Sequence, residues 1–278
     1  MIMDTKTHRF VPGAEFPWQY KYEHMAVTTD CVIFTYEDWA LKVLLVRRGE
    51  APCKGMWAFP GGFLRNDETA EQGALRELKE ETALVPSSPI VQLGVFSDVH
   101  RDPRERVLTV AFYALVKPSE VLGGDDAEEA AWFPVDAVPP LAFDHEKIFD
   151  AAMERLRRDI HFQPVGFDLL DETFTIPDLQ RLYEAILGVK FDRRNFQRKI
   201  LASGILEEAP VTAEPEMECF KESIPLEDME ITPEAVSMEP IERAPVHKKA
   251  RPGRKGGWFT LNRKRYEELK EEEHKMEF

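Results

Sequence analysis

Hydrophobic and polar positions divide the chain into two sets of predicted elements. In the first set, β-branched and aromatic runs predict strands at 26–36, 41–48, 90–99, 106–116 and 130–138. Helical periodicity predicts helices at 70–82 and 144–158. Thr69, followed three positions later by Gln72, forms a capping-box signature for the first of these helices. In the stretch at 55–63, Pro60 and the glycines are predicted to end any regular element.

A second set of elements begins near residue 175. One helix is predicted from Thr175 to Gly188, with Pro177 in its first turn, and a second from Asp192 to Gly204. Shorter segments suggest a strand starting at 205–210, a strand at 256–262 and a charged, helix-prone tail at 264–278. Residues 209–247 are rich in Pro, Glu and Met without a sustained period, so we expect a flexible insert there.

Length and composition place the chain among water-soluble, two-domain proteins. Its 278 residues exceed the usual size of one domain, and 43% of them are hydrophobic, as in globular proteins. No apolar run approaches the ~18 residues that a membrane span needs. The three cysteines are scattered, and the first residues lack the apolar core of a signal peptide. We therefore expect a cytoplasmic protein with reduced thiols and no membrane partner.

Charge is spread unevenly within a formal net charge of −15. Residues 207–247 hold twelve acidic side chains against Lys221 and Arg243, whereas residues 248–265 hold eight basic side chains and no acidic one. The acidic total therefore conceals a concentrated basic block, which is the more informative feature for predicting partners.

Three glutamates crowd the end of the predicted helix at 70–82. Glu77 and Glu81 are four residues apart and share a face, with Glu80 beside them, so their like charges destabilise a bare helix. A divalent cation would remove this repulsion, and Mg²⁺ favours a few carboxylates together with water and phosphate oxygens. Arg76 lies four residues before Glu80 and can orient it. On these residues alone, a solvated acidic helix face remains an equal alternative.

The spacing of the whole segment resembles the Nudix box, the signature of the Nudix hydrolase family. Gly62 is followed after five residues by Glu68, and after seven more by Arg76-Glu77-Leu78, Glu80-Glu81 and Leu84. The departure is Ala83, where the family pattern has glycine. That position turns the chain out of the helix, so we expect a geometric adjustment there rather than a loss of activity.

The resemblance implies an α/β/α sandwich and a Mg²⁺ (or Mn²⁺) site for attack of water on a diphosphate linked to another moiety. Glu77 and Glu81 would be the main metal ligands, assisted by Glu80 and the Gly61 carbonyl, and the catalytic set would be Glu77, Glu80, Glu81 and Arg76. A carboxylate outside the box often completes such sites. The candidates are Asp125, Asp126, Glu128 and Glu129, although a solvated loop is the favoured interpretation of that cluster.

Three arginines precede the strand predicted at 106–116, and arginine forks suit phosphate recognition. Without the family, a surface loop with internal Asp–Arg pairs would be preferred. With it, the chain resembles the branch that handles ADP-ribose and related nucleotide sugars. The implied substrate-binding residues are Arg47, Phe63, Arg101, Arg104, Arg106 and His145. His145 could equally be a satisfied histidine at a helix start.

The second set of elements resembles the winged helix of the Nudix-related transcriptional regulators, which respond to ADP-ribose-like or sugar ligands. In a winged helix the second helix enters the DNA major groove. The implied DNA-binding residues on that helix are Arg193, Arg194, Asn195, Gln197, Arg198 and Lys199. The wing would contribute Lys248, Lys249, Arg251, Arg254 and Lys255. Two alternatives to DNA binding are a basic helix face paired with its acidic neighbours and a dimerisation module. The acidic insert would also oppose the approach of DNA unless it projects away from the basic helix.

The expected organisation is therefore an α+β protein in which a Nudix sandwich precedes a winged helix. We expect an N-terminal extension at 1–22, a Nudix domain at 23–158, a winged-helix domain at 159–208, the acidic insert at 209–247, and a basic wing strand with a charged tail at 248–278. Two functions remain open. One is a Mg²⁺-dependent pyrophosphohydrolase of nucleotide sugars, and the other is a DNA-binding regulator of NAD or sugar metabolism that uses the Nudix domain as a ligand sensor. A homodimer is expected from the resemblance alone.

Overall fold

The computed structural model describes residues 2–4, 9–11, 22–86, 88–119, 121, 123, 127–160, 166–209 and 257–271. Most of the expected N-terminal extension, the acidic insert from residue 210 onward and the basic residues before 257 lie outside this part of the chain. Within the described ranges, no helix is both long enough and apolar enough to cross a membrane.

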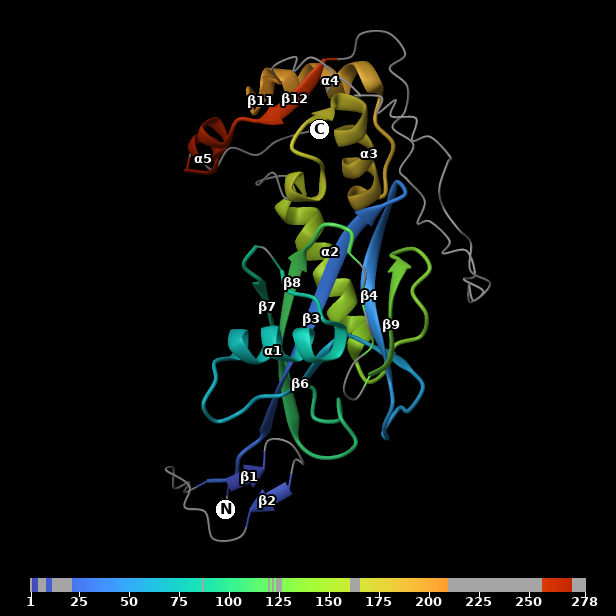
Figure 1. Ribbon diagram of the computed structural model, residues 1–278, viewed down its shortest axis with the longest axis vertical. Helices are drawn as coiled ribbons and strands as arrows, with labels where there is room; N and C mark the ends of the chain where they lie inside the picture. Colours follow the sequence, from blue (N-terminus) through green and yellow to red (C-terminus); the bar gives the residue numbers. More distant parts are fainter. Residues whose placement is uncertain are drawn as a thin grey trace, which may run out of the picture.

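A mixed sheet forms the centre of the larger unit (Figure 1). Its strands are β3 (Ala26–Glu37), β4 (Ala40–Arg48), β5 (Trp57–Ala58), β6 (Gly61–Phe63), β7 (Val91–Phe96), β8 (Val107–Leu115) and β9 (Ala127–Pro134). The strand order is β5-β4-β3-β8-β7, with β6 paired to β3 and β9 paired to β4. Only β3 and β8 run parallel among these paired strands of the described chain.

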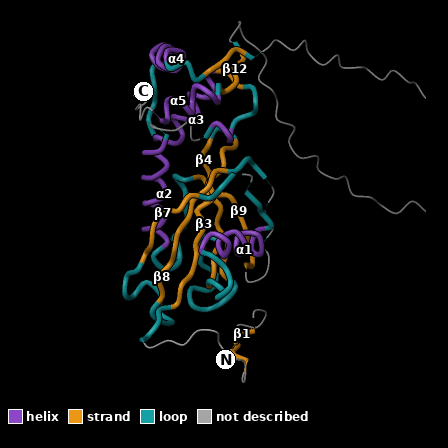
Figure 2. Tube along the Cα trace, turned by 90° about the vertical axis from the view of Figure 1, so that its left-hand side faces the viewer, coloured by secondary structure: helices purple, strands orange, loops and turns teal. Residues whose placement is uncertain are grey.

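Alternating side chains of β3 bury both faces of this sheet. Cys31 and Ile33 face helix α1 (Ala70–Thr82), whereas Val32 and Phe34 face helix α2 (His145–Asp159). Figure 2 shows the two helices on opposite sides of the strands. The expected α/β/α sandwich is therefore confirmed.

The smaller unit follows α2 at one end of the molecule. It contains the 3₁₀ helix η1 (Phe167–Leu169), β10 (Phe174–Thr175), α3 (Ile176–Leu187), α4 (Arg193–Ala202), β11 (Leu206–Glu208), β12 (Trp258–Leu261) and α5 (Arg263–Glu271). The three strands form a separate antiparallel sheet in the order β10-β12-β11. The short strands β1 (Ile2–Asp4) and β2 (Arg9–Val11) pair at the opposite end of the molecule (Figure 1).

One hydrophobic cluster connects the two units. It includes Phe34 of the central sheet, Leu156 of α2 and Leu182 of α3, all fully buried. On the surface, the guanidinium of Arg181 on α3 lies 4.2 Å from the ring centre of Trp39, in the β3–β4 turn. The smaller unit is therefore packed onto the sheet and onto the end of α2.

Most predicted elements are found within a few residues of their predicted bounds, whereas the two short strands at 55–63 were not predicted. There, β5 pairs with β4 and β6 pairs with β3, on either side of Pro60. Strands of two and three residues carry too little periodicity to be recognised locally. The strand predicted at 130–138 also begins earlier, at Ala127. The domain boundaries themselves stay predictions.

Candidate active site

Helix α1 carries the carboxylates of the Nudix box and is fixed at both ends and along one face. Thr69 and Gln72 form both bonds of the predicted capping box, and Ala74 and Leu78 are buried against the sheet. At the other end, Ala83 adopts the left-handed conformation, with a φ of 59°, and its N–H donates to Lys79. The expected geometric adjustment is therefore not found, because Ala83 takes the left-handed conformation that a glycine would adopt here.

Two glycines bring β6 close to the carboxylates of α1. The Gly61 N–H donates to Glu81 Oε2 at 3.0 Å. A Cβ at Gly62 would lie 2.5 Å from Glu77 Oε1, and one at Gly61 would lie 2.1 Å from the carbonyl oxygen of Thr29. Glycine is required at Gly61 because a side chain would collide with the backbone of β3, whereas a side chain at Gly62 would displace the Glu77 carboxylate.

Arg76 ties the box glutamates together. Its Nη1 donates to Glu77 Oε1 at 2.6 Å and to Glu80 Oε2 at 3.0 Å, which is the predicted contact with Glu80. Its Nε and Nη2 donate to the carboxylate of Glu68 at 2.9 and 2.5 Å, and Nη2 also reaches the Phe63 carbonyl. Arg76 is thus anchored on one carboxylate while it orients the two others.

Burial makes this site unfavourable for negative charge in the protein alone. It raises the pKa of Glu81 to about 8, with further contributions from Glu77 and Asp30, against the opposing bond from Gly61. Burial also raises the pKa of Glu77, despite its contact with Arg76. A cation placed here would favour the ionised carboxylates.

The donor set fits a hard divalent cation, although its members are directed elsewhere. Within the described chain, no three Asp, Glu, His or Cys side chains already converge as a ligand group. Glu77 and Glu80 point to Arg76, and Glu81 points to Gly61. Carboxylate and carbonyl oxygens are the ligands that Mg²⁺ and Mn²⁺ accept.

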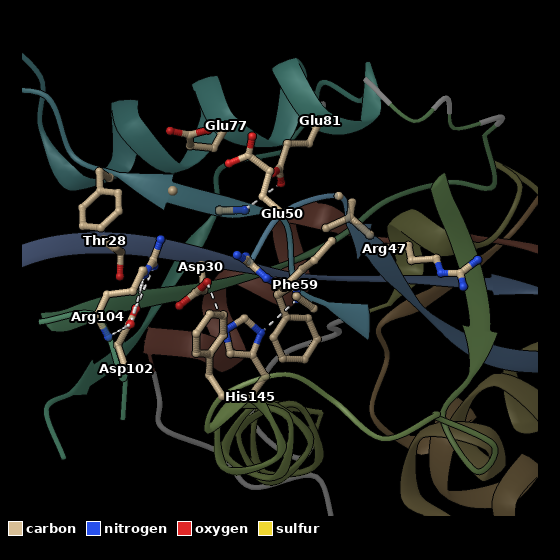
Figure 3. Close-up of a pocket in the computed structure, with 18 of the residues that line it drawn as sticks. Thr28, Asp30, Arg47, Glu50, Phe59, Glu77, Glu81, Asp102, Arg104 and His145 are labelled. Atoms are coloured by element: carbon tan, nitrogen blue, oxygen red, sulfur yellow. Dashed lines mark hydrogen bonds and ion pairs between the residues drawn. The ribbon is translucent and has the colours of Figure 1, made fainter. Parts of the chain in front are cut away.

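A pocket opens in front of Glu77 and Glu81 (Figure 3). Besides these carboxylates, its wall includes residues from β3, β4, the loop after β7 and the start of α2. They include Thr28, Asp30, Arg47, Arg48, Glu50, Phe59, Gly61, Gly62, Phe63, Arg101, Asp102, Arg104, Phe143 and His145.

Arg104 is held rigidly at the pocket wall. Asp102 accepts bonds from its Nε at 3.1 and 3.2 Å and from its Nη2 at 2.7 Å. Its guanidinium carbon lies 5.1 Å from the Phe63 ring centre and 5.8 Å from that of Phe143. Because its side chain remains 38% exposed, the guanidinium is oriented yet accessible to a ligand.

Arg101 and His145 also line the pocket, but both are buried. The Nη2 of Arg101 lies 2.8 Å from Asp144 Oδ1 and 3.7 Å from Asp30 Oδ2. His145 Nδ1 accepts a bond from the Phe59 N–H at 3.0 Å. These two residues are therefore engaged by the protein itself.

Arg47 and Arg106 are less well placed for a ligand. Figure 3 shows the side chain of Arg47 directed toward β9, where it lies 3.8 Å from Glu129. Arg106 does not line the pocket and donates to the carbonyls at 97–98.

The pocket includes residues that the sequence analysis did not single out, namely Asp30, Arg48, Glu50, Asp102 and Phe143. The signal for Asp30 was available, since it is a single acid within the apolar run of β3. By contrast, Glu128 and Glu129 are exposed and do not line the pocket, but they lie on strand β9 and not in the solvated loop that was the favoured interpretation. Asp125 and Asp126 lie outside the described residues.

Helix α4 presents a basic face on the smaller unit. Its buried Phe196 and Ile200 hold the helix against α3. Arg193, Arg194, Gln197 and Arg198 are exposed, and Asn195 and Lys199 are half-buried. Asn195 accepts a bond from Arg198 at 2.7 Å. Arg251 and Arg254, predicted on the wing, lie outside the described residues.

Comparison with known families and proteins agrees with this arrangement. Residues 25–152 match the NUDIX domain, and residues 166–216 match the NrtR DNA-binding winged helix domain. An ADP-ribose pyrophosphatase of Methanocaldococcus jannaschii is 45% identical over 127 residues, which are 46% of this chain and 72% of that protein. The ADPR responsive transcriptional repressor NtrR of Acinetobacter baylyi is 31% identical over 67% of this chain and 76% of that protein.

Solved structures give the same result. Shewanella oneidensis NrtR in complex with a 27mer DNA has a TM-score of 0.61 and 29% identity, over 87% of this chain and 95% of that one. A MutT/nudix family protein of Enterococcus faecalis has a TM-score of 0.62 and 32% identity, over 70% and 85% of the two chains. The chain therefore belongs to the Nudix family, in the branch that joins a Nudix domain to an NrtR-type winged helix.

Proposed function

We propose that this protein is a divalent-metal-dependent Nudix hydrolase that cleaves the diphosphate of ADP-ribose or of a related nucleoside diphosphate sugar. The observation that carries the proposal is that Glu77, Glu81 and Arg104 line one pocket. A cation and a diphosphate can therefore be held together there. The similarity to the pyrophosphatase of M. jannaschii supports ADP-ribose as the first substrate to test.

Glu77 and Glu81 would be the main ligands of Mg²⁺ or Mn²⁺, with Glu80 and the carbonyl of Gly61 as further ligands. When bound, the ion would offset phosphate charge and lower the pKa of the attacking water. Arg76 remains anchored on Glu68, so it can keep the carboxylates of Glu77 and Glu80 oriented while they face the ion.

Arg104 would bind a phosphate of the substrate. Arg104 lines the pocket and its side chain is partly exposed, while Asp102 fixes the direction of the guanidinium. Phe63 and Phe143 flank it and restrict its movement. This preorganisation lowers the entropy that an arginine loses when it binds a phosphate.

The test is Mg²⁺-dependent release of AMP from ADP-ribose. We expect Glu81→Gln to reduce turnover by at least about 100-fold, since removing one group that stabilises transition-state charge has effects of this size. Its circular dichroism spectrum should remain that of the wild type. The matched control is Glu71→Gln, an exposed glutamate in the first turn of the same helix, which should keep wild-type turnover. Unchanged turnover in Glu81→Gln would refute the proposed metal role.

A second function is supported by α4 and by the likeness to the DNA-bound NrtR structure. We propose that the winged helix binds duplex DNA and that the Nudix pocket acts as its ligand sensor. Arg193, Arg194 and Arg198 would contact phosphates, and Asn195 and Gln197 would reach base edges. The two functions are compatible, because the catalytic carboxylates and the basic helix lie in different units.

DNA binding can be measured by fluorescence anisotropy with the promoter region of the gene itself, over a range of salt concentrations. Replacing Arg194 by Ala should weaken binding to all sequences and reduce the slope of log K against log salt by about 1. Lys117→Ala, which removes an exposed lysine beside the Nudix sheet, is the control and should leave the slope unchanged. An equal slope for wild type and Arg194→Ala would count against this contact.

We also propose a homodimer, as the family resemblance implies. Val91 and Val95 of β7 and Val99 in the following loop are exposed, which supports β7 as a surface to test. Light scattering at several protein concentrations, with Val95→Lys as the variant, would distinguish a dimer from a monomer.

A further inference from the structure

Four polar side chains from three segments meet at the inner wall of the pocket. They are Asp30 on β3, Arg101 in the loop between β7 and β8, and Asp144 and His145 at the start of α2. Asp30, Arg101 and His145 are 6%, 7% and 4% exposed, and the Asp144 side chain is 8% exposed. Buried ionisable groups are costly unless they are paired, so this cluster needs a reason for its presence.

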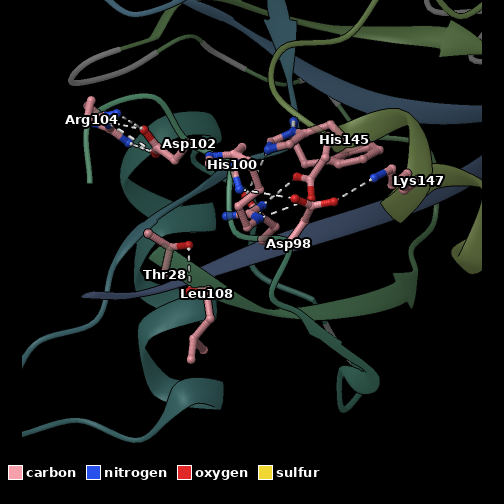
Figure 4. Close-up of polar contacts among 12 residues, drawn as sticks. Thr28, Asp98, His100, Asp102, Arg104, Leu108, His145 and Lys147 are labelled. Atoms are coloured by element: carbon pink, nitrogen blue, oxygen red, sulfur yellow. Dashed lines mark hydrogen bonds and ion pairs between the residues drawn. The ribbon is translucent and has the colours of Figure 1, made fainter. Parts of the chain in front are cut away.

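Two nitrogens of the Arg101 guanidinium, Nε and Nη2, are engaged by carboxylates of the protein. Its Nη2 and Nε donate to the two oxygens of Asp144 at 2.8 and 3.2 Å, and Nη2 also lies 3.7 Å from Asp30 Oδ2. Arg104, three residues later, keeps an exposed guanidinium beside the same pocket. The two arginines of this loop therefore differ in what they can contact, and Figures 3 and 4 show Arg104 beside Asp102.

Asp144 occupies the N-cap position of α2 but makes no side-chain capping bond. Aspartate is among the best N-cap residues, because its carboxylate usually accepts a bond from an amide of the first turn. The N-cap residues of α1, α3 and α4 all make such bonds. At α2 the carboxylate of Asp144 instead accepts bonds from Arg101. The helix therefore lacks a capping bond at the position where this side chain binds Arg101.

The bond between Phe59 and His145 determines which nitrogen of the histidine carries its proton. Because Nδ1 accepts the Phe59 N–H, the proton of the neutral ring is on Nε2. Burial lowers the pKa of His145, which favours this neutral form. Nε2 lies 3.6 Å from Asp30 Oδ1, so its N–H faces that carboxylate.

Asp30 in turn packs against the residue that holds Glu81. A Cβ at Gly61 would lie 2.8 Å from Asp30 Oδ1, and the Gly61 N–H donates to Glu81 Oε2 at 3.0 Å. Asp30 and Gly61 are also paired across β3 and β6. The Asp30 carboxylate therefore lies directly against the glycine whose N–H holds Glu81.

We propose that Arg101, Asp144 and His145 form a buried clamp that positions Asp30 against Gly61 and so fixes the direction of Glu81. Arg101 is then a positioning residue and makes no contact with the substrate. The catalytic part of this inference rests on the proposed hydrolase function. Its structural part, the orientation of Glu81 and the proton position on His145, does not.

The catalytic test compares Arg101→Lys with wild type in ADP-ribose hydrolysis. Lysine keeps the charge but cannot donate in parallel to both oxygens of Asp144. We expect kcat to fall by about 100-fold, the effect of a misplacement near 1 Å, while KM stays close to wild type. Asp144→Asn is a second variant with the same expected pattern. An increase in KM with unchanged kcat would show that Arg101 binds substrate and would overturn the proposal.

Lys147→Met is the matched control. Lys147 connects the same helix to the same loop, through Asp98 at 3.4 Å, but it does so at the surface (Figure 4). We expect wild-type kcat and KM in this variant. A loss as large as that of Arg101→Lys would mean that any tether between the loop and α2 suffices, which would contradict the clamp.

Two measurements test the clamp without turnover. The first is Mn²⁺ affinity by electron paramagnetic resonance, which should fall at least tenfold in Arg101→Lys because Glu81 is misdirected, and unchanged affinity would contradict the proposal. The second is the ring ¹⁵N NMR signal of His145, assigned with His145→Gln. Wild type should show the Nε2–H form, and Asp30→Asn should alter it, whereas an Nδ1–H form in wild type would overturn the proposal. If wild type hydrolyses no nucleotide sugar, the proposed hydrolase fails, but both measurements still decide on the clamp.

Discussion

At the scale of single residues, Ala83 shows how the chain departs from its family pattern without losing the local geometry. It adopts a φ of 59° at the end of α1, where the family has glycine. The left-handed conformation costs an L-residue roughly 1–2 kcal/mol. The structure therefore keeps the turn that the box requires, at the expense of stability.

Ala83→Gly should raise the free energy of unfolding by about 1 kcal/mol, since glycine adopts this conformation without the steric cost. Urea denaturation would measure the change. The reciprocal control is Gly188→Ala at the end of α3, where φ is 69° and a Cβ would meet nothing within 4 Å. It should destabilise by a similar amount, and a stabilising effect there would contradict the argument.

Glu81 predicts a pH dependence of stability. Its pKa rises from 4.5 to about 8 on folding, so the folded state retains a proton that the unfolded state loses in this range. In a buffer with a chelator, the unfolding free energy should therefore fall as pH rises from about 4.5 to 8, by up to about 1.4 kcal/mol per pH unit. Mg²⁺ should restore stability at pH 8, since it binds the ionised form.

Glu81→Gln should remove this part of the pH dependence, whereas Glu71→Gln should retain it. Chemical denaturation at a series of pH values would measure both variants. Equal slopes for wild type and Glu81→Gln would show that the carboxyl of Glu81 ionises without cost in the folded protein.

The residues of the Nudix box could be found from the sequence because their roles follow from fixed spacing along one helix. Asp30 and Arg101 could not be connected in this way. They are more than seventy positions apart and meet only after β3 and the loop before β8 have packed. Residues whose partners come from distant elements leave no local pattern, even when one of them is a conspicuous acid in an apolar strand.

At the scale of elements, the helices were predictable where both ends carry recognisable caps. Helix α1 has the predicted bounds, and α3 begins after Thr175 and ends before Gly188. Strands β5 and β6 were missed because they exist through pairing with β4 and β3, and such pairing is a tertiary property. Local propensity therefore defines long elements, whereas short strands depend on the completed sheet.

The turn between β3 and β4 forms a contact with α3 that can be measured. Trp39 is 57% exposed and lies under the guanidinium of Arg181 at 4.2 Å. Exposed cation–π pairs of this kind contribute about 0.5–1 kcal/mol. A double-mutant cycle of Trp39→Leu and Arg181→Gln should give a coupling energy in this range in urea denaturation.

The control cycle pairs Trp39→Leu with Lys190→Gln, because Lys190 forms its ion pair with Glu184. Those two changes should be additive. A coupling near zero for the pair of Trp39 and Arg181 would mean that the turn and α3 are close without stabilising each other.

At the scale of the whole molecule, the order of elements predicted both folds but not how they are joined. The sequence shows an amphipathic α2 and an apolar β3, yet it does not show that one cluster extends from Phe34 to Leu182. Tyr113, on the sheet, also donates to Asp159 at the end of α2. The units are separate in topology but continuous in packing.

Helix α2 connects the pocket to the winged helix. His145 begins the helix at the pocket, and Asp159 ends it beside the winged helix, a length of about 22 Å at 1.5 Å per residue. A mutation that tilts or shifts α2 should therefore alter both the pocket and the surface on which the winged helix packs. Under the two proposed functions, a substitution that shifts α2 is therefore expected to change ligand binding and DNA binding together.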